Sequence, residues 1–310
     1  MNLLFSQLKK ARSARRAAKD AASGEVRLSV MVASDASPQT ARAVREALRP
    51  QTANGKLYVA GFGPERGLPP TNTLSDAAVV VSGSSADLAA SLYAAHAAAG
   101  IACCVVVWQD GGPEGVSRLV DTGVPVEALL PGDAQRVGDF LGSWLVRTLP
   151  DLAAVLGAGF VCCRRAQALA VAGEAARNNA LVGALPVLDG ADMPAMMATE
   201  VAMVFKLAET YGLELDKARA AEAACVALSS FGLRGVARAA VRSLPFPAFL
   251  VKTAVAAAGT YALGRVLMAY YDYLLQTREP EPRPAHVISV EPVPRDGADS
   301  QDTVGARPAV

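Results

Sequence analysis

The sequence predicts an α/β domain with a mostly parallel sheet, followed by an all-α helical domain. From residue 26 to residue 149 short apolar runs alternate with helical segments, which is the pattern of a parallel sheet covered on both faces. After residue 151 the apolar residues recur at three- and four-residue steps, which favours helices. The 310 residues, 52% of them hydrophobic, are enough for two domains with their own cores. The net charge of +1 predicts no nucleic-acid partner.

The α/β domain is expected between residues 23 and 150. Its strands are predicted where short runs are apolar or β-branched, at 28–33, 56–60, 77–82, 101–108 and 124–130. Its helices are predicted between these runs, at 38–48, 87–99 and 133–148. The alternation places one connection after each strand, so the loop that follows the first strand is the first place to look for a ligand site.

The helical domain is expected between residues 151 and 276. Residues 152–163 and 166–175 are predicted to form one or two helices, and a longer helix is predicted from 193 to 211. That helix has Asp192 as its N-cap and Pro194 in its first turn, and Gly212 ends it. Further helices are predicted at 214–229, 233–243 and 248–276. In the last of them, Gly259 and Gly264 allow a neighbouring helix to approach closely.

Four blocks of the second half carry a resemblance to a known family. They read NALVGALPVLDGADMP, MVFKLAETYGLELD, FGLRGVARA and KTAVAAAGTYALGR, and they lie between residues 177 and 273. This region resembles the YcjF-type bacterial domain of unknown function (DUF six-nine-seven). The resemblance attaches no activity to the domain, but it implies a preceding Era-like GTPase domain and association with a membrane. The residues of these blocks for which we expect a structural or interfacial role are Asn179, Pro186, Asp192, Pro194, Glu200, Lys206, Glu209, Gly212, Arg234, Gly259 and Thr260.

The first half is similar in element order to a GTPase domain, so the nucleotide motifs can be checked one by one. A phosphate loop needs glycines, a lysine and a hydroxyl for magnesium. At the corresponding positions stand Ser34, Gln39, Thr40 and Ala41, and Asp35 adds a negative charge. The guanine-reading motif is replaced by Trp108, Gln109, Asp110 and Gly111, and no Asp-x-x-Gly follows the strand at 56–60. We therefore expect a degenerate GTPase-like (pseudo-GTPase) domain.

The sequence offers little for other chemistry. The loop at 61–67 reads GFGPERG, but a dinucleotide site needs a glycine where Arg66 stands, so an ordinary loop is predicted. The two histidines, His96 and His286, do not support a catalytic triad or a metal centre. Ser82 to Ser85 and the pair of Asp189 with Asp192 are interpreted as turns and helix caps. We expect no catalytic residue, no cofactor and no metal.

The cysteines and the two ends of the chain bear on the compartment. The five cysteines are predicted to be reduced core residues, with adjacent pairs pointing apart, which fits a cytoplasmic protein. Residues 1–22 predict a basic amphipathic helix, in which Met1 to Asp20 either contacts an anionic membrane surface or a partner, or is a solvated leader. Residues 277–310 are rich in proline, and we expect a disordered tail in which 287–290 can pair with a partner's sheet edge.

These observations favour a non-catalytic scaffold or adaptor with an unknown protein partner, cytoplasmic and open to attachment at the inner membrane surface. Two alternatives remain open from the sequence. One is a GTP-binding protein with an unconventional phosphate loop. The other is an integral membrane protein inserted through the apolar helices of the second half, against which the charges within 249–275 argue.

Overall fold

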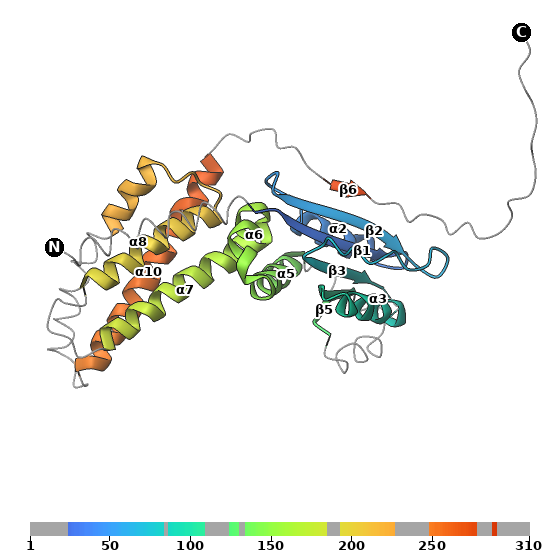
Figure 1. Ribbon diagram of the computed structural model, residues 1–310, viewed down its shortest axis with the longest axis horizontal. Helices are drawn as coiled ribbons and strands as arrows, with labels where there is room; N and C mark the ends of the chain where they lie inside the picture. The colour runs from blue at the N-terminus through green and yellow to red at the C-terminus, as the bar shows by residue number, and fades with distance from the viewer. Residues whose placement is uncertain are drawn as a thin grey trace, which may run out of the picture.

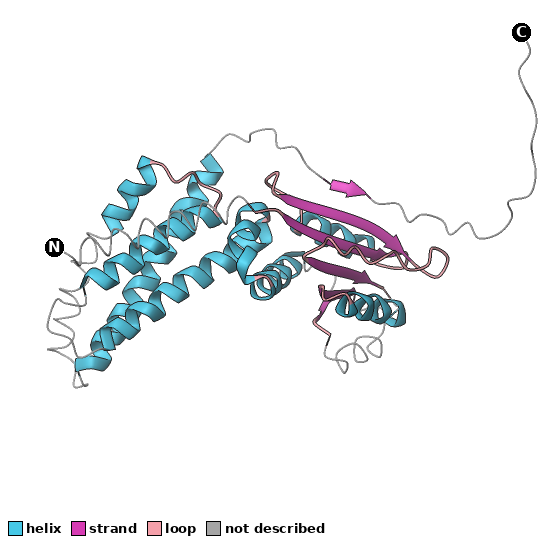
Figure 2. Ribbon diagram, viewed as in Figure 1, coloured by secondary structure: helices cyan, strands magenta, loops and turns pink. Residues whose placement is uncertain are grey.

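The computed structural model describes residues 24–83, 86–108, 124–129, 134–184, 193–226, 248–277 and 287–289. A parallel sheet with helices on both faces occupies one end of the molecule, and a group of long helices occupies the other (Figure 1; Figure 2). The α/β class predicted from the sequence is confirmed. Every strand pair in the described residues is parallel.

The sheet has six strands in the order β5-β4-β3-β1-β2-β6. The strands are β1 (Val26–Ala33), β2 (Gly55–Phe62), β3 (Ala77–Ser82), β4 (Ala102–Trp108), β5 (Val126–Leu129) and β6 (Val287–Ser289). The predicted strand at 77–82 is confirmed to the residue, because all six of its residues are buried in the middle of the sheet. The first five strands follow a doubly wound order. The chain places β2 on one side of β1 and then adds β3, β4 and β5 on the other side.

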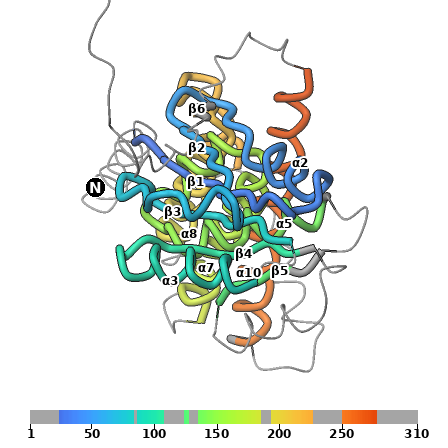
Figure 3. Tube along the Cα trace, turned by 90° about the vertical axis from the view of Figure 1, so that its right-hand side faces the viewer, coloured from blue at the N-terminus to red at the C-terminus, as the bar shows by residue number. Residues whose placement is uncertain are grey.

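Helices α2 (Pro38–Ala47) and α5 (Ala134–Thr148) lie on one face of the sheet, and α3 (Ala86–Ala98) lies on the other (Figure 3). Apolar residues point to both faces of the central strands, which explains why helices cover both faces of the sheet. In β4, Cys104 and Val106 face the core beneath α2 and α5, while Cys103 and Val105 face α3. Central strands of this kind are apolar on both sides, and they therefore read as continuous hydrophobic runs.

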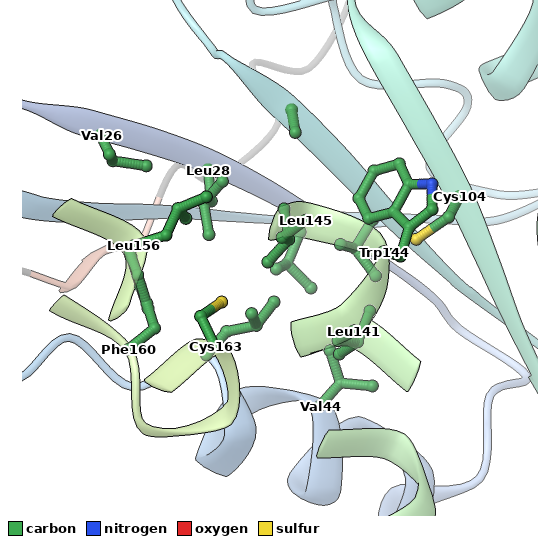
Figure 4. Close-up of a cluster of buried hydrophobic side chains, with 14 of the residues drawn as sticks. Val26, Leu28, Val44, Cys104, Leu141, Trp144, Leu145, Leu156, Phe160 and Cys163 are labelled. Atoms are coloured by element: carbon green, nitrogen blue, oxygen red, sulfur yellow. The ribbon is translucent and has the colours of Figure 1, made fainter. Parts of the chain in front are cut away.

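The larger core lies under α2 and α5 (Figure 4). It joins Leu28 of β1 to Val44 of α2 and to Leu141, Trp144 and Leu145 of α5. The short helix α6 (Ala153–Gly159) extends this core with Leu156, and Phe160 follows it, both fully buried. The sheet and the first helices of the second half thus share one hydrophobic core.

Between residues 150 and 277, most of the described residues are helical. After a 3-10 turn at Pro150–Leu152 and α6 come α7 (Val161–Ala184), α8 (Met193–Thr210), a helical segment at 217–226 and α10 (Ala248–Thr277). The helix predicted at 166–175 is longer than expected, because α7 continues without a break to residue 184. The helix predicted at 233–243 lies outside the described residues, as do Pro186, Asp192 and Arg234.

Helix ends agree with the glycines seen in the sequence. Gly212 has a φ of +66° and ends α8. The amide of Leu213 donates to the carbonyl of Ala208, and the amide of Gly212 donates to the carbonyl of Glu209. These two bonds form a Schellman motif, which requires a residue in the left-handed region. The same pair of bonds, with a φ of +72°, ends α3 at Gly100.

Residues 287–289 correct one expectation. The sequence suggested a disordered tail whose apolar residues can pair with a partner's sheet, but β6 pairs with β2 of its own chain. The partners are Leu57 with Val287 and Val59 with Ser289. An unpaired strand edge is a template for any short extended segment, and this chain supplies that segment itself.

Helices α7 and α10 approach each other most closely at Gly264. A Cβ atom at this position would lie 2.7 Å from the Cβ of Ala172 and 3.3 Å from the sulfur of Met203. Glycine and alanine at the crossing therefore let the two backbones come together, as the sequence predicted for Gly264. The core around the crossing is built from alanines of α7 and larger side chains of α8 and α10.

We expect Gly264→Ala to lower the free energy of unfolding by about 1–3 kcal/mol, because the added methyl group overpacks the crossing. Gly173→Ala is the matched control, since Gly173 neighbours Ala172 on α7 but has open space where its Cβ would lie. That substitution should raise the free energy of unfolding by about 0.5–1 kcal/mol. Urea unfolding followed by circular dichroism measures both. Equal effects of the two substitutions would contradict the close crossing.

Candidate functional site

The loop after β1 is the stretch in which the sequence predicted a degenerate phosphate loop, and it has only four residues. They are Ser34, Asp35, Ala36 and Ser37, and α2 begins at Pro38. The amide of Ser34 donates to the carbonyl of Phe62 at 2.8 Å, and the amide of Ala36 donates to the carbonyl of Ala33 at 3.1 Å. Backbone amides that are already bonded are not available to wrap a phosphate.

Neighbouring strand ends close in on this loop. A Cβ atom at Gly63 would collide with the hydroxyl oxygen of Ser34, and one at Gly83 would collide with the carbonyl oxygen of Asp35. Glycine is therefore required at position 83, where the contact is with backbone, whereas a side chain at position 63 would force the hydroxyl of Ser34 to turn away. The carboxylate carbon of Asp35 also lies within 2.8 Å of the Cβ position at Gly83. The ends of β1, β2 and β3 are thus packed against one another and against an acidic side chain.

The remaining degenerate motif positions are dispersed. Gln39 is exposed on α2, and Thr40 is only 2% exposed, with no hydrogen-bond partner for its hydroxyl. Ala41 is half-buried. Trp108 is the last residue of β4, and Gln109 and Gly111 lie outside the described residues. Of the described positions, Ala41 lines a cleft beside α2 together with Ser34 of the loop, whereas Thr40 is buried in the core.

Three residues named by the family resemblance meet in the helical half. Asn179 of α7, Glu200 of α8 and Thr260 of α10 are all buried, with exposed fractions of 0%, 3% and 1%. The side-chain amide of Asn179 donates to the hydroxyl of Thr260 at 2.8 Å and to the Oε1 atom of Glu200 at 3.4 Å. The hydroxyl of Thr260 also donates to Oε1 of Glu200 at 3.4 Å. Each of the three helices thus contributes one polar side chain to a buried network.

Other residues of the family blocks are spread along α8. Pro194 is its second residue, and Lys206 forms an ion pair with Glu174 of α7 at 3.1 Å, exposed to solvent. Gly259 is half-buried beside Thr260 on α10. None of these three positions adds a group to the buried network. The resemblance therefore named one network and several separate packing and capping positions.

Glu209 is a buried carboxylate near the end of α8. It is 6% exposed, and its Oε1 atom has no hydrogen-bond partner. Burial raises the pKa of Glu209 from 4.5 to about 7, although the nearby charge of Lys206 lowers it in part. Removing the carboxylate from water disfavours its charged form, and no partner restores the lost solvation. Buried groups with perturbed pKa values occur at functional sites, but they also occur in structural interiors.

A second cluster on the helices was not foreseen. The guanidinium of Arg219 lies 5.4 Å from the ring centroid of Tyr271 and pairs with Glu222 at 2.9 Å. The hydroxyl of Tyr271 donates to the same carboxylate at 2.9 Å, and its ring meets the edge of Tyr211 at 5.5 Å. These contacts hold the helical segment 217–226 on α8 and α10. The spacing of Asp216, Arg219 and Glu222 at three-residue steps was the available signal.

The cysteines agree with the sequence in part. Cys103, Cys104 and Cys163 are buried free thiols, and burial raises the pKa of Cys103 to about 12. Cys225 is exposed, however, so the expectation of a core position was wrong for it. The sulfurs of Cys162 and Cys163 lie 3.7 Å apart, whereas a pair pointing apart was expected. Both residues lie in the first turn of α7.

His96 is buried on α3 and does not reach a candidate site. Its Nδ1 atom lies 2.8 Å from the carbonyl of Leu92, one turn earlier in the same helix. Among the described residues, no three His, Cys, Asp or Glu side chains gather into a group that could hold a metal ion. Within the same part of the chain, no helix combines the length and the apolar character needed to cross a bilayer.

Comparisons of the chain with protein-family models, with curated proteins and with solved structures found no match. The candidate site is therefore defined by its geometry alone. Two features of that geometry bear on function. One is the loop after β1, in which the amides of Ser34 and Ala36 are already hydrogen-bonded within the chain, and the other is the set of buried polar groups between the long helices.

We expect Glu209→Gln to change how stability depends on pH. Because the folded protein holds this proton more tightly than the unfolded chain, the stabilisation is complete below pH 4.5 and is lost as the pH rises to about 7. The substitution should be close to neutral at pH 4.5, and at pH 8 it should raise the free energy of unfolding by at most about 3 kcal/mol.

Urea unfolding of the wild type and the variant across this pH range measures the effect. Glu214→Gln is the control, because Glu214 is exposed five residues further along. A difference between wild type and Glu209→Gln that stays constant from pH 4.5 to pH 8 would contradict the raised pKa.

Proposed function

We propose that this chain is a non-catalytic scaffold or adaptor, built from a degenerate GTPase-like domain and a YcjF-type helical domain. The observation that carries the proposal is the loop after β1. It lies between the first strand and its helix, which is the place of the phosphate loop in nucleotide-binding α/β domains. In this chain, the amides of Ser34 and Ala36 already donate to backbone carbonyls, and the loop carries the carboxylate of Asp35.

The length of the loop supports this proposal first. The phosphate-loop motif has eight residues, ending in lysine and a hydroxyl residue. In the corresponding stretch, residues 34–41, the second half already belongs to α2. Position 38 is a proline, which has no amide hydrogen, and the amide of Ala41 donates to the carbonyl of Ser37. Only residues 34–37 remain for a turn that would have to surround the phosphates.

The charge at the loop supports it further. A phosphate site gathers positive charge, because the lysine and magnesium offset the charge of the nucleotide. Here the loop contributes the carboxylate of Asp35, and Thr40 takes the place of the lysine, buried in the core. The nucleotide would therefore meet a like charge and no cationic side chain from this loop.

The helical half supports the role of a scaffold. Val266, Tyr270 and Tyr273 of α10 follow one another at four- and three-residue steps, so they share one face of the helix. Their exposed fractions are 67%, 41% and 61%. Large apolar side chains gathered on one exposed face are typical of surfaces that contact other proteins. A protein partner is therefore part of the proposal, and its identity is left to experiment.

Nucleotide binding is the direct test. We expect no saturable binding of fluorescent (methylanthraniloyl) GDP or GTP to the full chain with magnesium present, up to about 1 mM nucleotide. A competent GTPase titrated under the same conditions shows that the assay works. Saturable, magnesium-dependent binding would instead favour a GTP-binding protein with an unconventional phosphate loop.

Attachment to a membrane surface through Met1 to Asp20 is the second part of the proposal, and these residues lie outside the described part. We expect the full chain to sediment with membranes and to be released by a salt wash, because screening weakens basic contacts to anionic lipid. A chain that lacks residues 1–20 should remain in the supernatant. Retention of the full chain through an alkaline carbonate wash would point to insertion of the helical half and contradict surface attachment.

A further inference from the structure

The described part of the chain contains a cleft of about 320 Å³ beside α2, at the outer side of β1 and β2. Its apolar wall is formed by Val30 and Val32 of β1 and by Leu57 and Val59 of β2. Val30 and Val59 are cross-strand partners on the face that carries α2. Val32 and Val59 are only half-buried, because α2 packs toward β3 and β4 and leaves this part of the sheet open.

The loop that follows β2 places a guanidinium over the end of this cleft. Gly63 and Gly67 exchange backbone hydrogen bonds at 2.8 and 3.4 Å, and Gly67 has a φ of +69°. The left-handed conformation folds the loop back on itself. As a result, Arg66 returns over the sheet, and its Nη1 atom lies 3.0 Å from the position that a Cβ would occupy at Gly61. Glycine at position 61 therefore makes room for the guanidinium.

A second guanidinium reaches the cleft from α2. Arg45 lines it, and the nearest acidic residue along the helix, Glu46, is bound by Arg42 at 2.9 Å. Neither Arg45 nor Arg66 forms an ion pair with any described carboxylate, including Glu65 in the same loop as Arg66. Two cationic side chains thus border an apolar cleft without a protein partner for their charge.

We propose that this cleft binds a small carboxylate with an apolar body, such as a medium-chain fatty acid. The carboxylate lies between Arg45 and Arg66, because a guanidinium matches the flat, two-oxygen shape of a carboxylate. The apolar body lies along Val32 and Val59, the half-buried valines of the cleft, where its burial adds to the affinity. The volume is at the lower end of the range for small-molecule sites, which fits a single short chain.

This cleft adjoins the loop whose geometry carries the proposed function, because Ser34 of that loop and Ala41 of α2 also line it. The switch point between β1 and β3 is closed by Asp35 and Gly83, whereas the cleft opens on the other side of β1. The inference rests on Arg45, Arg66 and the valines of the cleft, and octanoate binding is measured without nucleotide, so its failure is distinguishable from the failure of the proposed function. It also gives a role to the GFGPERG loop, which the sequence suggested was an ordinary connection.

Calorimetric titration of the full chain with octanoate tests the proposal. We expect saturable binding at one site, and octanamide, which has the same chain without the charge, should bind about tenfold more weakly. Arg45→Gln and Arg66→Gln should each weaken octanoate binding about tenfold, because each removes one charged donor. Arg42→Gln is the matched control on the same helix, since Arg42 is exposed, does not line the cleft and is paired with Glu46. It should bind octanoate as the wild type does.

Thermal melting of the three variants shows that each is folded before titration. The proposal is overturned if octanoate shows no saturable binding, or if octanamide binds as tightly as octanoate. It is also overturned if either Arg45→Gln or Arg66→Gln binds like the wild type. A loss in Arg42→Gln equal to the loss in the two cleft variants would show a general charge effect and would likewise overturn it.

Discussion

Helix α7 belongs to both hydrophobic cores, and the arrangement of the whole chain depends on this. Cys163 in its first turn packs in the core under the sheet, while Ala168 to Ala175 pack in the core of the long helices. Gly142 on α5 makes the junction possible, because a Cβ there would collide with the carbonyl of Cys162. A helix is a stiff element, so a displacement of α7 in one core moves side chains in the other. The sheet and the helical half are therefore mechanically linked through one continuous helix.

The interior of the helical half combines small apolar residues with a few buried polar ones. Alanines and Gly264 let the helices approach closely. Because these residues are small, packing alone distinguishes poorly between one helix register and a shifted one. The network of Asn179, Glu200 and Thr260 supplies that difference, since a shift of one helix would leave its buried polar groups without partners. Glu209 shows the opposite case, a buried carboxylate whose raised pKa reflects the absence of such a partner. The polar network thus favours one arrangement of the helices, whereas the buried charge of Glu209 lowers the stability of the folded protein.

The sequence predicted local structure well and long-range contacts poorly. Strands such as 77–82 were predicted to the residue, because burial on both faces leaves an uninterrupted apolar run. Strand β2 continues two residues further than predicted, since Gly61 and Phe62 suggest a turn although Phe62 is fully buried. The meeting of Asn179 with Thr260 joins residues 81 positions apart, and although the sequence predicted a close approach at Gly264, it did not predict which helix lies there. The ion-pair spacing around Arg219 was visible in the sequence, but its contact with Tyr271 required the fold.

The pairing of β6 with β2 has a consequence for the order in which the chain assembles. During synthesis the first five strands leave the ribosome before any of the long helices, and β6 leaves after all of them. The sheet can therefore form its centre early, with the edge of β2 still open. Among the described strands, closing that edge requires the pairing with the largest separation in sequence, and the entropic cost of closing a loop rises with its length. In a growing chain, the edge of β2 therefore stays open until β6 has emerged and paired with it.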